Sequence, residues 1–134
     1  MQEIWGSKGF LYLSKGLDAS ALRQRVHAHN LSNVNTPNFK RSTVQFEEIL
    51  KHAVAGNKTL ATTSSAHIGR NDRETADARI VRDTATSMRT DGNNVDVDKE
   101  MAELAVNQLY YNALSQQLDG RLAGLRYVIN EGRR

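Results

Sequence analysis

Histidines are the first side chains to consider for chemistry in this 134-residue chain, which contains four of them and no cysteine. His27 and His29 form an H-x-H pair, but residues two apart on a helix point about 200° from each other, so the two imidazoles cannot share a metal ion. His52 and His67 lie in unrelated segments. We therefore expect no metal site, and we expect these imidazoles to be exposed or to lie at an interface.

A group of carboxylates at Asp96, Asp98 and Glu100 could be read as a site for a divalent cation. Its spacing, however, lacks the calcium-loop pattern. The group stands at the start of a long apolar-periodic segment, where Asp96 or Asp98 can supply the N-cap oxygen. Glu100 and Glu103, like Asp98, suit the positive end of the helix dipole. We interpret these carboxylates as helix-capping residues.

The sequence offers no starting point for catalysis or for nucleic-acid binding. It has no Gly-rich phosphate loop, no nucleophile elbow and no spacing that suggests a Ser/His/Asp set. We therefore expect no catalytic residues, no cofactor and no small-molecule substrate. The formal net charge is +3, and the basic residues are interspersed with acidic ones, which argues against a nucleic-acid partner.

The length is that of one domain, so we expect residues 1–134 to form a single unit. No stretch approaches the roughly 20 apolar residues that a membrane helix needs. Residues 1–10 also lack the apolar region and the cleavage site of a secretory signal. If the protein leaves the cytosol, we expect it to use another route.

The first element that could position functional residues is a helix predicted over residues 7–35. Its apolar seam lies within an arc of about 80° at 100° per residue, which is narrow for a globular core and suits a coiled-coil contact. We expect the helix to stop near Asn35, because the residue before Pro37 is pushed out of the α region. Asn33 or Asn35 would take the left-handed terminating conformation. The seam consists of Phe10, Leu13, Leu17, Ala21, Gln24, Ala28 and Leu31.

The second element is a longer helix predicted over residues 97–130. Its seam repeats every four and then three residues: Val97, Met101, Leu104, Gln108, Tyr111, Ser115, Leu118, Leu122, Leu125 and Ile129. The opposite side carries a stripe of mostly small residues, namely Ala102, Val106, Leu109, Ala113, Gly120 and Gly124. A glycine inside a helix costs about 1 kcal/mol relative to alanine, so the stripe indicates close approach by a second partner.

Oligomerisation would supply the surface that these helices lack within one chain. We predict that subunits pack through both seams and through the small-residue stripe. The predicted packing residues are Leu13, Leu17, Ala21, Ala28, Met101, Leu104, Tyr111, Ala113, Leu118, Gly120, Leu122, Gly124 and Leu125.

The middle segment, residues 36–96, has a less regular residue pattern, and we expect part of it to be flexible. A turn at 36–38 is followed by a short helix that we predict at Val44–Ala53. Residues 55–94 read either as a mobile surface segment or as two short strands, near Leu60–Thr63 and Arg79–Arg82, that become ordered only against a neighbour. The fold class is therefore mainly α, a coiled-coil-like unit of two long helices around an irregular middle.

Two stretches resemble a known family. The run from His29 to Arg41 resembles the N-terminal signature of the flagellar rod and hook axial proteins, an Ala-Asn-hydrophobic-x-Asn-x-x-Thr-Pro-Gly-Tyr run. Asn38 stands where the family prefers Gly, and Phe39 where it prefers Tyr; asparagine is the other residue best able to accept a positive φ. The signature residues here are Asn30, Leu31, Asn33, Thr36, Pro37, Asn38 and Phe39.

The C-terminal stretch indicates which branch of this family the chain resembles. The run from Asp91 to Met101, followed by Asn107, Tyr110-Tyr111, Leu114 and Leu118, resembles the proximal rod branch of the family. Other rod and hook members tend to end in an Ala-Tyr-Glu-Ala-Asn-like run, which this chain lacks. The resemblance covers both terminal parts of the chain, about 70 residues, and says little about residues 55–91.

The resemblance implies a structural subunit of the proximal rod of the flagellar basal body, and no enzyme. It implies export through the flagellar type III apparatus without a cleaved signal, and packing of the terminal helices into tubes in the periplasm. The implied partners are copies of the chain itself, other rod proteins, and the membrane-ring and adaptor proteins at the rod base. A cytosolic coiled-coil adaptor, or another rod protein of the same family, is the alternative; the adaptor leaves the Asn-rich Thr-Pro signature unexplained.

Overall fold

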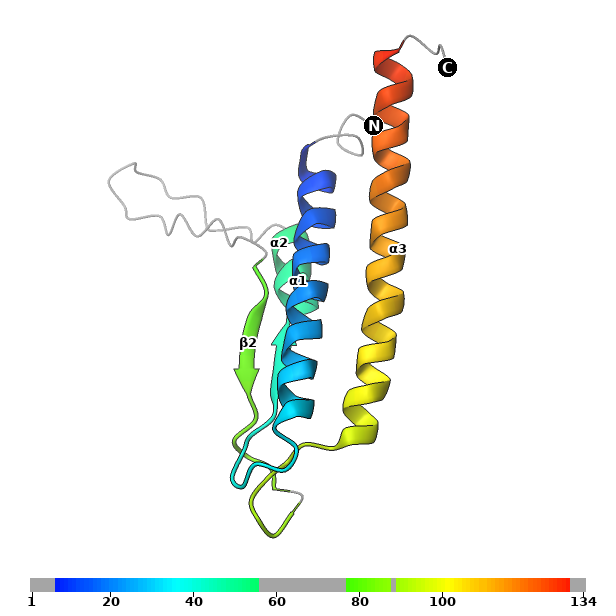
Figure 1. Ribbon diagram of the computed structural model, residues 1–134. Helices are drawn as coiled ribbons and strands as arrows, with labels where there is room; N and C mark the ends of the chain where they lie inside the picture. The colour runs from blue at the N-terminus through cyan, green and yellow to red at the C-terminus, as the bar shows by residue number, and fades with distance from the viewer. Residues whose placement is uncertain (1–6, 56–76, 88, 131–134) are drawn as a thin grey trace, which may run out of the picture.

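The computed structural model describes residues 7–55, 77–87 and 89–130, which form three helices and two strands. In chain order these are α1 (Ser7–Ser32), β1 (Ser42–Gln45), α2 (Glu47–Ala55), β2 (Arg79–Arg82) and α3 (Val97–Ile129). α1 and α3 lie side by side, and the two strands and α2 lie against α1 (Figure 1). The predicted class, mainly helical with long N- and C-terminal helices, is confirmed. No helix in these ranges is long and apolar enough to cross a membrane.

Small and polar residues hold α1 and α3 together as an antiparallel hairpin. A Cβ on Gly16 would lie 3.2 Å from Leu114 Cδ1, so glycine permits a close approach there. Further along, Ser20 Oγ donates to Asn107 Oδ1 at 2.9 Å, and Asn107 Nδ2 donates to the Ser20 carbonyl at 2.9 Å. Position numbers rise along α1 as they fall along α3, so the helices run in opposite directions (Figure 1).

The face of α1 that is buried within the chain differs from the predicted apolar seam. Its buried residues are Gly16, Ala19, Ser20, Val26, His27 and Asn30. At 100° per residue this face is centred roughly 120° from the seam. Phe10 on the seam is 44% exposed, and Ala28 is also exposed. The hairpin therefore uses a small and polar face of α1 and leaves much of its apolar seam uncovered.

The end of α1 also differs from the prediction. The helix stops at Ser32, before the expected limit at 35, and a positive φ at Asn33 or Asn35 is not found. Two successive turns carry the chain off the helix instead: the Asn33 amide donates to the Asn30 carbonyl at 3.1 Å, and the Thr36 amide donates to the Asn33 carbonyl at 3.0 Å. The described non-glycine residue with a positive φ is Asn38, at 57°.

The prediction of one helix at Val44–Ala53 is wrong at its start. Residues 42–45 form β1, which pairs antiparallel with β2 in the register Ser42 to Arg82 and Gln45 to Arg79. α2 begins only at Glu47. Phe46 separates the two elements because its buried ring packs on Ala19 of α1, with Leu50, Ala53 and Ala78 around it.

The strand predicted at Arg79–Arg82 is present as β2, so the mobile reading of residues 55–94 is wrong for this part. Its neighbour is β1 of the same chain. The strand suggested near Leu60–Thr63 lies outside the described residues.

Candidate assembly interface

The two stretches that carried the family resemblance lie against each other at the end of the hairpin where α1 stops and α3 begins. The carboxamide of Asn93 donates to the carbonyls of Asn33, Val34 and Thr36, at 3.1, 3.1 and 2.9 Å. Asn93 is fully buried, and its Oδ1 accepts from the Val95 amide at 2.7 Å. One side chain of the second stretch thus satisfies three carbonyls of the turn that follows α1.

A second link joins the same stretches through the backbone. The Asn38 amide donates to the Asp91 carbonyl at 2.9 Å. Phe39 packs on His29, with ring centroids 5.5 Å apart and the rings tilted by 56°. The signature residues therefore act locally: they set the path of the chain from α1 to β1 and dock it on the approach to α3.

Asparagine carboxamides also hold β1 in place. Asn30 Nδ2 donates to the Ser42 carbonyl at 2.8 Å, and Asn30 Oδ1 accepts from the Ser42 amide at 3.0 Å, as a neighbouring strand would. Asn94 Oδ1 accepts from the Arg41 amide at 2.6 Å, and Asn94 Nδ2 donates to the Asp83 carbonyl at 3.1 Å. Both asparagines are buried, so each replaces water as the partner of backbone groups.

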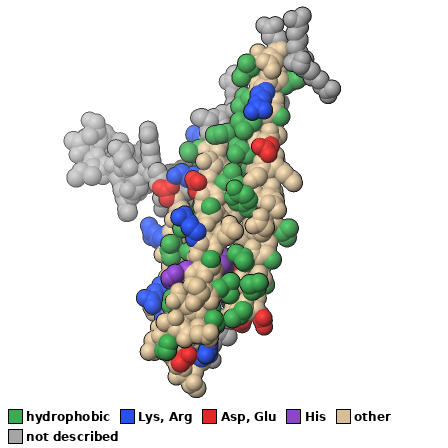
Figure 2. All heavy atoms as spheres, in the orientation of Figure 1, with side chains coloured by type: hydrophobic (Ala, Val, Ile, Leu, Met, Phe, Trp, Pro, Cys, Tyr) green, Lys and Arg blue, Asp and Glu red, His purple; other side chains and the backbone are tan. Residues whose placement is uncertain are grey.

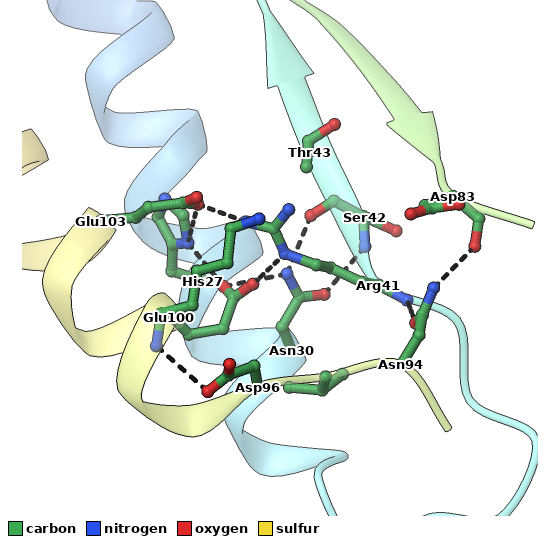
Figure 3. A network of polar contacts seen from close by, with 12 residues as sticks. His27, Asn30, Arg41, Ser42, Thr43, Asp83, Asn94, Asp96, Glu100 and Glu103 are labelled. Atoms are coloured by element: carbon green, nitrogen blue, oxygen red, sulfur yellow. Dashed lines mark hydrogen bonds and ion pairs between the residues drawn. The ribbon is translucent and has the colours of Figure 1, made fainter. Parts of the chain in front are cut away.

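A charged cluster, here called the polar junction, joins α1, the residue before β1, and α3. It consists of His27, Asn30, Arg41, Glu100 and Glu103 (Figure 3). Glu100 is 0% exposed; its Oε2 contacts His27 Nδ1 at 2.6 Å and accepts from Asn30 Nδ2 at 3.1 Å. Arg41 forms ion pairs with Glu100 and Glu103. Every polar atom of the Glu100 carboxylate is therefore paired, as burial requires.

Electrostatics favour the ionised form of Glu100. Burial alone would raise the pKa of this carboxyl, but hydrogen bonds from Arg41, His27 and Asn30 outweigh it, so the pKa lies below its ordinary value of 4.5. Burial likewise opposes the charge of Arg41, yet its bonds to Glu100 and Glu103 raise the pKa of its guanidinium above the ordinary value.

The polar junction corrects two sequence predictions. His27 is 6% exposed and bonded to a carboxylate within the chain, so the expectation of an exposed or interfacial imidazole is wrong for His27, whereas His29 is exposed. Glu100 lies in the first turn of α3 but is buried and tied to three other residues, so helix capping does not explain it. The N-cap prediction itself is confirmed, because the Asp96 side chain accepts from the amides of Asp98 and Lys99.

The sequence carried a weak signal for this cluster. His27 and Asn30 stand three residues apart, so they share one face of α1, and a polar face of this kind has to meet polar partners if it is buried. Nothing in the local pattern points to Arg41 or Glu100 as those partners, since they are 14 and 73 positions from His27.

The donor atoms of His27, Glu100 and Glu103 lie within 4.8 Å of one another, a spacing that could suit a metal ion. Arg41 already places its guanidinium against both carboxylates. Both carboxylates are thus already paired with a cation of the same chain, and the junction ties α1, the residue before β1 and α3 together.

None of the thirteen predicted packing residues is fully buried in the single chain. Those on α1 and α3 that are half-buried are Leu13, Leu17, Ala21, Leu104, Leu118, Leu122 and Gly124. Those that are exposed are Ala28, Met101, Tyr111, Ala113, Gly120 and Leu125. Of the signature residues, Asn30 is buried, Leu31, Asn33 and Phe39 are half-buried, and Thr36, Pro37 and Asn38 are exposed.

The apolar seams of both helices turn to one side of the hairpin. From the positions that face each other, the α1 seam is rotated by roughly 80° and the α3 seam by roughly 60° in the same sense, which in an antiparallel pair is the same side. Figure 2 shows hydrophobic side chains gathered along both long helices on the viewed face. The α3 seam includes large residues such as Met101 and Tyr111, which are 53% and 40% exposed. This arrangement suits packing between subunits.

Comparison with known proteins gives a consistent answer. No family model matches the chain. The flagellar basal body rod protein FlgB of Bacillus subtilis (strain 168) is 35% identical over 121 residues, which is 90% of this chain and 92% of that protein. The protein of the same name from Borrelia hermsii is 41% identical over 103 residues, 72% of this chain and 76% of the relative. The one from Escherichia coli (strain K12) is 28% identical over 127 residues, 90% and 92% of the two chains.

Proposed function

The chain belongs to the family of flagellar basal body rod proteins named FlgB, and we propose that it polymerises through α1 and α3 as a structural subunit of the proximal rod. In this role it forms part of the drive shaft that transmits rotation of the motor for motility. Its residues act by packing, and no described group is arranged for catalysis.

One observation carries the proposal: the hairpin closes through small and polar residues while its apolar seams remain uncovered. Glu100 and Asn107 are the buried residues of α3, and both are polar. Large apolar residues on the same helix, such as Met101 and Leu109, are 53% and 70% exposed. A monomer would lose free energy by leaving this surface in water, at about 25 cal/mol for each Å² that a neighbour could cover. A polymer of the same chains covers it.

The partners follow from this role. They are other copies of the chain, other rod proteins, the membrane-ring and adaptor proteins at the rod base, and the flagellar type III export apparatus. The proposed location is the periplasmic rod of the basal body, reached without a cleaved signal. The names of the relatives and the uncovered helix faces support assembly with rod components.

The test is deletion of the gene in its own organism, followed by complementation with the full chain. We expect the deletion to abolish swimming and to leave basal bodies without a rod in electron micrographs, and the chain to restore both. A protein that stays in the cytosolic fraction of a normally swimming deletion strain would instead be a coiled-coil adaptor.

A further inference from the structure

The last turn of α3 is apolar around most of its circumference. Leu125, Tyr127, Val128 and Ile129 are 47%, 63%, 73% and 76% exposed. At 100° per residue these four side chains spread over about 200° of the helix. An apolar surface this wide on one helix turn is expected to be covered by a neighbour, and Arg126 is left as the charged side chain of the turn.

The α1–α3 contact does not account for this turn. The positions of α3 that face α1 are 100, 107, 114 and 121, and Arg121 already lies opposite Gly9 near the start of α1. Val128, seven residues after Arg121, continues that line to within about 20°, whereas Tyr127 points roughly 120° away from Arg121 at 100° per residue. Its exposure therefore reflects the direction in which it points and not only its place near the helix end.

A groove lies on the other side of the hairpin from the apolar seams, between α1, β1 and α3. Its volume is about 380 Å³, which is within the range of pockets that hold several side chains or a small ligand. Val26, Val44 and Val106 contribute apolar walls, and Tyr110 stands at the edge, 54% exposed. Val106 is itself 58% exposed, so the groove is open to a neighbour.

Two carboxylates on the rim of the groove are more exposed than the arginines that pair with them. Glu47 and Glu103 line it, with side chains 58% and 39% exposed. Their cationic partners are more hidden, since the side chains of Arg23 and Arg41 are 19% and 12% exposed. The groove thus combines an apolar floor with outward-facing carboxylates, and the last turn of α3 combines apolar side chains with Arg126.

We propose that the last turn of α3 of one copy docks in the groove of a second copy, with Tyr127 and Val128 in the groove and Arg126 beside Glu47 and Glu103. A copy cannot fill its own groove, because Val106 and Val128 are 22 residues apart on one helix, about 33 Å. The contact joins two different surfaces, so it is head-to-tail and leaves a free groove and a free helix end for further copies. The inference rests on the proposed function and names the surfaces that polymerise.

Cysteine cross-linking tests the contact directly, because the natural chain contains no cysteine. The deletion strain would be complemented with full chains carrying Val106→Cys and Val128→Cys together, and isolated basal bodies treated with a short bismaleimide. We expect cross-linked dimers and larger products from the pair, and none from either single variant. The control pair, Gln116→Cys with Val128→Cys, places the first thiol at an exposed position outside the groove and should give none.

A variant with a filled groove tests the same contact in case the cysteine pair itself disturbs assembly. Val106→Trp fills the groove from an exposed position and should leave the helical circular dichroism unchanged while abolishing rods and swimming. Val106→Ala leaves the groove open and should swim.

Normal swimming with Val106→Trp, or rods that give no product between chains, would overturn the inference while the proposed function stands. Rods that persist without the gene would remove the proposed function itself.

Discussion

Asn38 and Gly92 meet where the two signature stretches join, and both adopt a positive φ, 57° and 79°. A Cβ on Gly92 would lie 2.6 Å from Asn38 Oδ1, closer than real Cβ contacts allow. The expectation that Asn38 takes the tight conformation for which the family uses glycine is therefore confirmed. The second tight position, at Gly92, lies directly against the first.

Gly92→Ala should destabilise the purified chain by about 1–3 kcal/mol, because it combines a strained φ with a clash against Asn38. Asn38→Gly in the same chain should recover part of that loss by removing the clash but not the strain. The matched control is Gly120→Ala, where a Cβ meets nothing within 4 Å and the helix should gain up to about 1 kcal/mol. Urea unfolding followed by circular dichroism measures all three, and an unchanged midpoint for Gly92→Ala would contradict the account.

Asn38→Gly should be tolerated, since glycine adopts a φ of 57° freely and the backbone bond from residue 38 to the Asp91 carbonyl is kept. Asn38→Val should cost about 1–3 kcal/mol and impair assembly, because a β-branched side chain strongly disfavours positive φ. Swimming assays of the two variants at equal expression provide the measurement. Equal motility would show that this turn does not limit assembly.

Glu100→Gln should destabilise the hairpin by about 1–3 kcal/mol, because it removes one of the two carboxylates paired with Arg41 and places a neutral amide among donors at a site that is 0% exposed. Asp98→Asn is the control in the same turn of α3; its exposed carboxylate acts mainly through the helix dipole, and its loss should cost less than about 1 kcal/mol. The melting temperatures of full chains that carry Glu100→Gln or Asp98→Asn, measured by thermal unfolding, test this difference. Similar losses for both variants would mean that the polar junction contributes little.

Acid should weaken the hairpin through the same carboxylate. The pKa of Glu100 is lower in the folded chain than its ordinary value of 4.5, so the unfolded chain binds the proton more readily. The stabilisation is present above about pH 4.5 and is lost as the pH falls through the folded pKa. Glu100→Gln should therefore reduce the drop in unfolding free energy between about pH 7 and about pH 3. An identical drop in the unfolding free energy of the natural chain and of the Glu100→Gln variant would mean that other groups cause the acid sensitivity. Glu47 is the first of these to examine, because its pKa is also lowered.

Ala113→Leu with Gly120→Leu tests whether the small-residue stripe lies between subunits. In the single chain Ala113 is exposed and Gly120 has open space around it, so the isolated protein should be unharmed or slightly more stable. In a packed polymer the larger side chains should cost about 1–3 kcal/mol per site, so rod completion should fail while export continues. Swimming cells with normal basal bodies would show that the stripe faces solvent.

Leu118→Ala probes the other seam of α3. Leu118 is half-buried in the single chain, so its truncation should cost the monomer less than the about 2–5 kcal/mol typical of a fully buried leucine. A larger loss should appear only on assembly. The comparison is between the unfolding midpoint of the purified variant and the number of complete rods in cells that express it.

The two long helices are predictable from the sequence because the same apolar spacing repeats over many turns. α3 keeps its apolar period over 33 residues and begins at an aspartate cap, so its limits follow closely. β1 has four residues with one large apolar side chain, and its partner β2 lies more than 30 positions away. Pairing of that kind depends on tertiary contacts that local pattern does not encode.

The candidate site was less predictable than the fold for a related reason. Pattern analysis locates buried faces by their apolar residues, whereas the innermost contacts here are made by His27, Asn30, Glu100 and Asn107. Polar residues become acceptable inside only when partners from other segments satisfy them, and those partners are not visible in any one window. The family resemblance marked Asn30 as significant, but its role as a partner of β1 and Glu100 needed the three-dimensional arrangement.

The bonds that close the hairpin join residues far apart in the chain: Asn30 and Glu100 are separated by 70 positions, and Ser20 and Asn107 by 87. A polypeptide delivered through a narrow passage with its N-terminus first would present α1 without α3, and with only β1 and α2 able to pack on it, until residues beyond 100 had followed. The entropy of closing so long a loop must be overcome before these contacts stabilise anything. The order of arrival thus keeps α1 unpaired for most of the delivery, and a chain interrupted before residue 100 offers no paired helices to a growing polymer.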